Sequence, residues 1–362
     1  MQFGIIFPTK IDDWQVIADA EAMGYHRAWV PDSQMIWSDC YATLALAAVN
    51  TSRIQLGTGV SIPRTRIAPV TAHSIASIHR LAPGRVFLGL GTGHTAMRVM
   101  GMQPATIREF REYLRVVRAL LRGEEVDYTL DGVTRPIRFL HQQDGFIALE
   151  PEIPLYIAAN GPRALALTGE YGDGLTTLMY EDPRVLSAHL DTVRQGAAAA
   201  GRVLPANFHL AAVTAVVVLR PGETLASERV IDACGAWVTT ALHFVYEVYA
   251  QSSDESVIPP AFHGVWEQYC AHVAAMRTPA DRRYLELHLG HSTFLVPSER
   301  RFVTPELIAA TTLTGAPEEI IARLRAAEAA GLNELTLLPP TAGNAGDRAH
   351  LREFAEQVMS RY

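Results

Sequence analysis

Polar residues follow several short apolar stretches of this chain, and their side chains have the clearest potential for chemistry. Asp32 and Ser33 come directly after the run 27–30, where a carboxylate and a hydroxyl could exchange a proton or bind a polar substrate; the alternative is a capped or solvated loop. Trp37 could stack on a ring or pack against its own loop. His94 could exchange a proton near neutral pH, because imidazole has a pKa of about 6.5, or it could cap a helix.

Backbone groups form a second class of candidates. Asn160, Gly161 and Pro162 stand between an apolar run and a helical pattern, so free N–H groups could bind a phosphate there, as at many helix starts. The stretch Gly89–Gly93, which contains Thr92, has glycine at alternate positions. A dinucleotide-binding fingerprint needs a wider spacing between its second and third glycine and an acidic residue about 20 positions later. This stretch has neither feature.

Lys10 is the only lysine among the 31 basic residues of the chain. It follows the first apolar run, where a compact ammonium group could bind a substrate anion or a developing oxyanion. The alternative is a solvated loop, since Asp12 and Asp13 are close in sequence. The motifs of serine hydrolases and of P-loop enzymes are absent from the sequence.

Thirteen histidines raise the question of a metal site. The pairs His288/His291 and His263/His272 lack the accompanying carboxylate that two-histidine sites use, and the zinc motif His-Glu-x-x-His is absent. The sequence therefore predicts no metal site.

The composition is typical of a compact globular protein. The 362 residues are 49% hydrophobic and 19% charged, which excludes a disordered chain or a coiled coil. A formal net charge of −7 lacks the basic excess that nucleic-acid binding requires. The three cysteines are widely spaced, as expected for reduced thiols. The first residues lack the basic region of a signal peptide, and the most apolar stretch, 211–219, is shorter than the roughly 20 residues of a membrane-spanning helix. We therefore expect a cytoplasmic protein without a membrane partner.

The elements that must position the candidate residues alternate between short apolar runs and longer helical patterns. This alternation is typical of parallel strands joined by helices, and eight such strands suit a (β/α)8 barrel. The predicted strands are 2–7, 27–30, 53–58, 85–90, 154–158, 174–178, 208–219 and 334–338. The predicted helices are 12–23, 39–50, 69–80, 104–121, 162–171, 183–200, 317–330 and 346–361.

Two stretches interrupt the alternation within a single predicted domain, 1–362. Residues 123–153 contain Asp-Gly between apolar runs, which predicts a hairpin-like excursion. Residues 224–314 are rich in Tyr, His and Trp and contain Pro259-Pro260, so we expect a mostly helical insertion after the seventh strand. In a barrel this insertion emerges over the active-site face; a packing subdomain or subunit contact is the alternative.

Several motifs occur in a fixed order on the predicted strand ends. They are Leu56–Pro63, Ala72–Ile78, Gly84–Gly93, Pro154–Pro162 and Ala326–Leu338. Together they resemble the bacterial luciferase-like family of flavin- and deazaflavin-dependent oxidoreductases, in particular its methylene-tetrahydromethanopterin reductase-like branch. The resemblance covers roughly residues 1–220 and 315–340.

This resemblance implies a barrel that binds FMN or coenzyme F420 at its C-terminal face. In the family a non-prolyl cis peptide bulges from the third strand behind the ring, which corresponds here to Gly59-Val60. The implied cofactor-binding residues are Trp37, Gly59, Val60, Thr92, Asn160, Gly161, Pro162, Thr177 and Leu178. The catalytic candidates are Lys10, Asp32, Ser33 and His94. Sugar-phosphate dehydrogenase-like members carry Asp-His and a glutamate where this chain has Asp32-Ser33 and His94. The acid/base pair of those members therefore cannot be assigned to the matching residues of this chain.

Two enzyme functions are compatible with the resemblance. In the first, F420 transfers a hydride to or from a small organic substrate. In the second, reduced FMN from a partner flavin reductase reacts with oxygen in a monooxygenase. A cofactor-binding protein without catalysis is a third possibility. The branch resemblance favours F420, and the family favours a homodimer.

Overall fold

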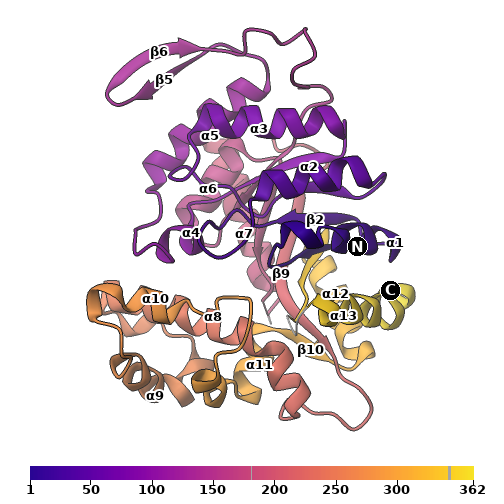
Figure 1. Cartoon of the computed structure of the whole chain (residues 1–362), viewed down its shortest axis with the longest axis vertical. Coiled ribbons are helices and arrows are strands. Elements are labelled where there is room, and N and C mark those ends of the chain that lie inside the picture. Colours follow the sequence, from indigo (N-terminus) through magenta and orange to yellow (C-terminus); the bar gives the residue numbers. More distant parts are fainter. Residues whose placement is uncertain (181, 341–343) are drawn as a thin grey trace.

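The computed structural model describes residues 1–180, 182–340 and 344–362. Its strands are β1 (Gln2–Ile6), β2 (Arg27–Val30), β3 (Gln55–Thr58), β4 (Val86–Leu90), β7 (Leu155–Ala158), β8 (Gly174–Leu178), β9 (His209–Val218) and β11 (Glu334–Leu338). They pair in parallel in the order β9-β11-β1-β2-β3-β4-β7-β8, and β8 pairs back onto β9. Figure 1 shows the strands with helices around them. This closure confirms the predicted (β/α)8 barrel.

Helices lie between the strands and after the last one, and side-chain caps mark the start of two of them. They are α1 (Gln15–Ala22), α2 (Cys40–Asn50), α3 (Ala68–Leu81), α4 (His94–Arg98), α5 (Ile107–Leu121), α6 (Pro162–Tyr171), α7 (Arg184–Ala199), α12 (Pro317–Ala329) and α13 (Asn344–Gln357). The side chain of Asp39 caps α2 by accepting from the Ala42 N–H at 2.8 Å. Helix α5 begins later than predicted, because Thr106 and Glu109 form a capping box there.

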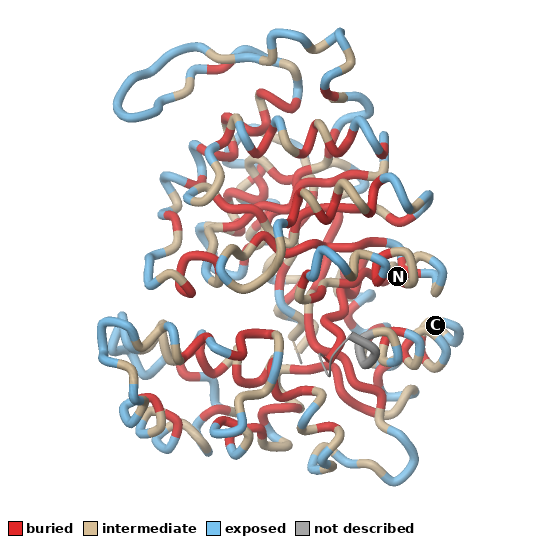
Figure 2. The backbone as a smooth tube through the Cα atoms, viewed as in Figure 1, coloured by how far each residue is buried: buried red, intermediate tan, exposed pale blue. Residues whose placement is uncertain are grey.

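Two segments stand outside the barrel. Residues 123–153 contain an antiparallel pair, β5 (Val126–Leu130) and β6 (Val133–Ile137), and this hairpin projects from the molecule and is mostly exposed (Figure 2). Residues 224–314 contain α8 (Glu228–Ser252), α9 (His263–Ala274), α10 (Arg283–Leu287) and α11 (Pro305–Thr311), which share their own apolar core. No helix of the described ranges is both long and apolar enough to cross a membrane.

One strand was not predicted from the sequence. Strand β10 (Leu313–Gly315) pairs in parallel with the end of β9, next to the insertion. Its three residues are too few to produce an alternating pattern, so only the partner strand reveals it.

A buried carboxylate ties the strands together inside the barrel. Glu334, which is fully buried at the start of β11, accepts hydrogen bonds from Arg27 and Trp29 of β2, each at 2.8 Å. The ring of His209 lies 2.9 Å from the same carboxylate. Burial alone would raise the pKa of Glu334, but the His209 hydrogen bond and the Arg27 charge outweigh it and lower the pKa to about 2. A Cβ at Gly4 would clash with this carboxylate, so β1 needs glycine there.

We predict that Glu334→Gln destabilises the fold by about 3 kcal/mol or more at neutral pH, because it leaves Arg27 buried without its charged partner. The folded pKa lies below the ordinary 4.5, so the carboxylate stabilises the native protein above that pH. This stabilisation is lost as the pH falls from 4.5 towards 2. Urea unfolding at neutral and acidic pH measures both effects. Glu267→Gln, at an exposed glutamate, is the control. Equal losses in the two variants would contradict the assignment.

Candidate active site

Parallel alignment brings all the predicted site residues to the C-terminal ends of the barrel strands. Lys10 follows β1; Asp32, Ser33 and Trp37 follow β2; Gly59 and Val60 follow β3; Thr92 and His94 follow β4; Asn160, Gly161 and Pro162 follow β7; and Thr177 and Leu178 end β8. Active sites of such barrels lie at this face. The contacts on this face fall into separate groups.

The peptide bond Gly59-Val60 is cis, as the resemblance implied. The glycines of the neighbouring strand end make room for this bulge. A Cβ at Gly91 would approach Val60 Cγ2 to 2.8 Å, which is closer than real Cβ atoms come. Side-chain atoms of Val60 therefore occupy the space above β4, and the residue itself is half-buried.

Asp32 holds the chain just beyond this bulge. Its carboxylate accepts from Ser61 Oγ at 2.6 Å and from Arg66 Nε at 3.0 Å, and only 3% of the residue is exposed. Gln34 Nε2 donates to the second carboxylate oxygen at 2.8 Å. These partners favour a positioning role for Asp32, because they occupy the oxygens that an acid or base would need free. Ser33 next to it is half-buried.

A second group connects the ends of β7 and β8. Asn160 Oδ1 accepts from Thr177 Oγ1 at 2.6 Å, from the Leu178 N–H at 3.3 Å and from the Tyr180 hydroxyl at 3.1 Å. His189 of α7 lies 3.3 Å from the Thr177 hydroxyl, and burial lowers the pKa of this histidine. The family resemblance implied Asn160, Thr177 and Leu178 at this face.

The N-terminus of α6 lies beside the Asn160 group and is open. The helix starts at Pro162 after Gly161, and no side chain caps it. A Cβ built on Gly161 meets no atom within 4 Å, so space lies above the first helical turn. The N–H groups of Arg163 and Ala164 belong to this turn, and the Arg163 side chain is exposed. These features suit the binding of an anion such as a phosphate.

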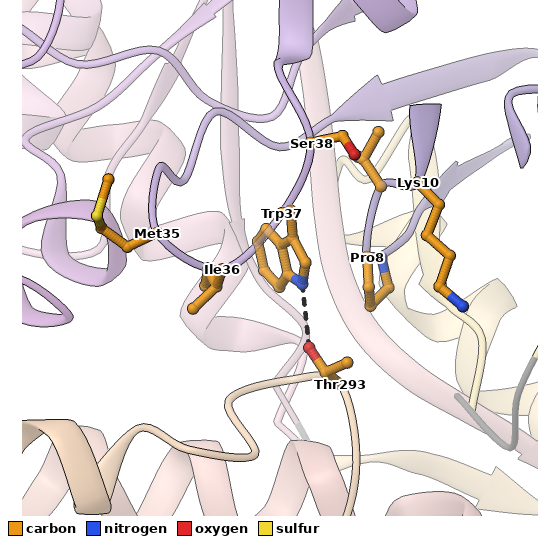
Figure 3. Close-up of a pocket in the computed structure, with 8 residues that line it drawn as sticks. Pro8, Lys10, Met35, Ile36, Trp37, Ser38 and Thr293 are labelled. Carbon is orange, nitrogen blue, oxygen red and sulfur yellow. Dashed lines mark hydrogen bonds between the residues drawn. The ribbon is translucent and has the colours of Figure 1, made fainter. Parts of the chain in front are cut away.

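A cavity of about 430 Å³ opens where the first two loops meet the insertion (Figure 3). Lys10 and Trp37 line it together with Pro8, Met35 and Thr293. Trp37 Nε1 donates to the hydroxyl of Thr293 at 3.0 Å, and this bond joins the β2 loop to the insertion. The volume is within the usual range for a small-molecule site.

His94 faces the insertion from the start of α4. It follows Gly93, which has φ of 90°, and its ring contacts Phe244 of α8 edge to face at 5.4 Å. Partial removal of the His94 imidazole from water lowers its pKa, although the residue remains exposed in part. The positive charge of Arg98 lowers this pKa further. A neutral imidazole at physiological pH can accept a proton.

Sequence patterns missed several residues of this face. Ser61 lies within the motif Leu56–Pro63 and Arg66 follows it, but no role was predicted for either residue; both bind Asp32. Tyr180, His189 and Thr293 carry no local signal, because only the folded chain brings them to Asn160, Thr177 and Trp37.

Comparison with known proteins gives relatives that share about half of the chain. It is 37% identical over 211 residues to 5,10-methylenetetrahydromethanopterin reductase of Methanolobus tindarius, a match that covers 56% of this chain and 61% of that protein. It is 34% identical over 198 residues to F420-dependent hydroxymycolic acid dehydrogenase of Mycobacterium tuberculosis, with 51% and 52% covered. The chain thus spans little more than half the length of these two relatives.

A solved structure matches over the whole length. The coenzyme F420 dependent tetrahydromethanopterin reductase from Methanopyrus kandleri superimposes with a TM-score of 0.71 at 21% identity, covering 100% of this chain and 99% of that one. This likeness shows the fold. The family model described as luciferase-like monooxygenase matches residues 1–334. The chain therefore belongs to the luciferase-like monooxygenase family, as its motifs predicted.

Proposed function

We propose that this protein is an oxidoreductase that uses coenzyme F420 to transfer a hydride to or from a small organic substrate. The observation that carries the proposal is the open N-terminus of α6, which shares a barrel face with the Gly59-Val60 bulge. The F420-dependent dehydrogenase of M. tuberculosis and the F420 dependent reductase of M. kandleri support this choice of cofactor.

The residues at the face fit a flat ring that carries a phosphate. Asn160, Gly161 and the α6 N–H groups would hold the phosphate, with Arg163 as a nearby positive charge. Gly59 and Val60 would support the ring. Both residues are half-buried, so part of each is accessible to it. When bound, a deazaflavin supplies two-electron hydride chemistry without activating oxygen.

The substrate would bind between the barrel face and the insertion. Lys10 and Trp37 line the cavity there, so an ammonium and an aromatic face are both available to a small polar substrate. His94, with its lowered pKa, is the candidate for accepting or returning the proton that accompanies hydride transfer. Asp32 would position the bulge through Ser61.

A monooxygenase that uses reduced FMN is the second candidate, because the family model that matches is described as a luciferase-like monooxygenase. It would require a separate flavin reductase. Oxygen consumption with reduced FMN, absent with reduced F420, would distinguish this function from the first.

The cofactor itself provides the first test. We expect apo-protein to retain F420 after gel filtration, identified by its absorbance and mass, and to bind FMN at least about 10-fold more weakly, a difference of about 1.4 kcal/mol. Equilibrium titrations that follow the intrinsic fluorescence of each cofactor measure both affinities. Retention of FMN alone would replace the proposed function with the monooxygenase.

We expect Gly161→Glu to abolish F420 binding, because it places bulk and negative charge above the open turn of α6. Gly264→Glu is a matched control: a Cβ at Gly264 also meets nothing within 4 Å, and this glycine lies on α9, away from the strand ends. The same fluorescence titration measures both variants. If F420 affinity survives in Gly161→Glu, the phosphate is not bound at α6.

His94→Gln tests the proton-transfer role. With F420 bound, the wild-type pH–rate profile should have an inflection below pH 6.5, because the protein lowers the pKa of this imidazole. The variant should be slower and should lack that inflection, while its F420 affinity stays near wild type. An inflection that persists in His94→Gln belongs to another group.

A further inference from the structure

Three histidines of the insertion meet in one buried cluster. His243 lies in the middle of α8, His288 follows the end of α10, and His291 lies in the next turn. One ring nitrogen from each lies within 4.8 Å of the others. At 1%, 5% and 7% exposure, all three imidazoles are removed from water. The sequence analysis noted the pair His288/His291 but predicted no metal site there; the fold adds His243.

Two carboxylates fix how these rings present their nitrogens. His243 Nε2 lies 2.8 Å from Glu299 Oε1, and His288 Nε2 lies 3.0 Å from Glu247 Oε1. Because a carboxylate only accepts, each of these Nε2 atoms carries a proton, so a neutral imidazole in either place has its lone pair on Nδ1. A histidine that donates to a carboxylate through one nitrogen and offers the other is the usual arrangement at metal centres.

The third histidine, His291, contacts a residue of the barrel. His291 Nε2 lies 3.1 Å from the hydroxyl of Thr95 in α4, and this hydroxyl can donate or accept. His291 Nδ1 lies 3.4 Å from His288 Nδ1. Two imidazole nitrogens bound to one tetrahedral zinc ion at 2.0–2.1 Å are also about 3.4 Å apart.

The cluster also contains two buried polar atoms that lack a hydrogen-bond partner. His243 Nδ1 and Glu299 Oε2 are both buried without a hydrogen-bond partner. Only 3% of Glu299 is exposed, and among the described residues no arginine or lysine forms an ion pair with it; its hydrogen-bond partner His243 supplies a positive charge only when protonated. A buried carboxylate in this situation is costly unless a cation compensates it.

We propose that His243, His288 and His291 bind one divalent transition-metal ion, with zinc as the best match to three neutral imidazoles. Glu299 and Glu247 orient the ligands, and the positive ion compensates the Glu299 carboxylate. Three protein ligands leave a fourth position for water or another oxygen ligand.

The proposed site is next to the substrate cavity. The His291 ring lies 6.4 Å from the ring of Trp37, and Thr293, two residues later, binds the Trp37 indole. Glu247 also forms an ion pair with Arg98 of α4 at 3.3 Å. Metal binding would therefore order the insertion against the barrel loops that bear the candidate active site.

The test uses full-length protein without a histidine tag. After chelator treatment and dialysis, we expect titration with Co²⁺ to give one ion per chain and the intense visible absorption of four-coordinate cobalt. Mass spectrometry of the metals in protein expressed with zinc should give the same stoichiometry. Zinc should raise the midpoint of thermal unfolding of the apo-protein.

Variants separate the proposed ligands from other histidines. His243→Gln and His291→Gln should lose the cobalt absorption and the thermal shift, whereas His263→Gln, at an exposed histidine of α9, should keep both. Glu299→Gln keeps all three ligands and should weaken metal binding about 10- to 100-fold. If a histidine variant fails to fold, Glu299→Gln still tests metal binding at this site.

Wild-type protein that binds no more metal than His243→Gln would overturn the proposal. Loss of binding in His263→Gln, or octahedral cobalt spectra that are unchanged in Glu299→Gln, would overturn it as well.

Discussion

The buried carboxylate of Glu334 is the interaction on which the geometry of the barrel depends. It connects β11 to β2 through Arg27 and Trp29 and to β9 through His209, so strands from opposite ends of the sequence share one acceptor. This ion pair restricts the registers in which β11 and β2 can lie. A shift of either strand would leave the Glu334 carboxylate or Arg27 unpaired in the interior. The strand ends at the opposite face are thereby fixed relative to one another.

At this face, polar groups that follow different strands form hydrogen bonds with one another. Asp32 after β2 binds Ser61 after β3, and Asn160 after β7 binds Thr177 at the end of β8. Each bond joins neighbouring strand ends. The face therefore presents the Gly59-Val60 bulge and an open helix N-terminus, while the insertion supplies a further wall through Thr293.

The sequence predicted what depends on local pattern. Strand ends could be located because short apolar runs precede residues such as Asp32 and Asn160, and the barrel then brings them to one face. Contacts between distant segments could not be located. His243 and Glu299 lie 56 residues apart, and nothing in the chain near either one signals the other. Strand β10 and the contacts of Asp32 with Ser61 and Arg66 were missed for the same reason.

The proposed cofactor site lies at the C-terminal barrel face, between the α6 N-terminus and the Gly59-Val60 bulge. A crystal structure of the protein with F420 tests it most directly. We predict density for the phosphate within hydrogen-bond distance of the Arg163 and Ala164 N–H groups, and for the ring against Val60. A ring bound elsewhere, or a phosphate held away from α6, would contradict the proposed site.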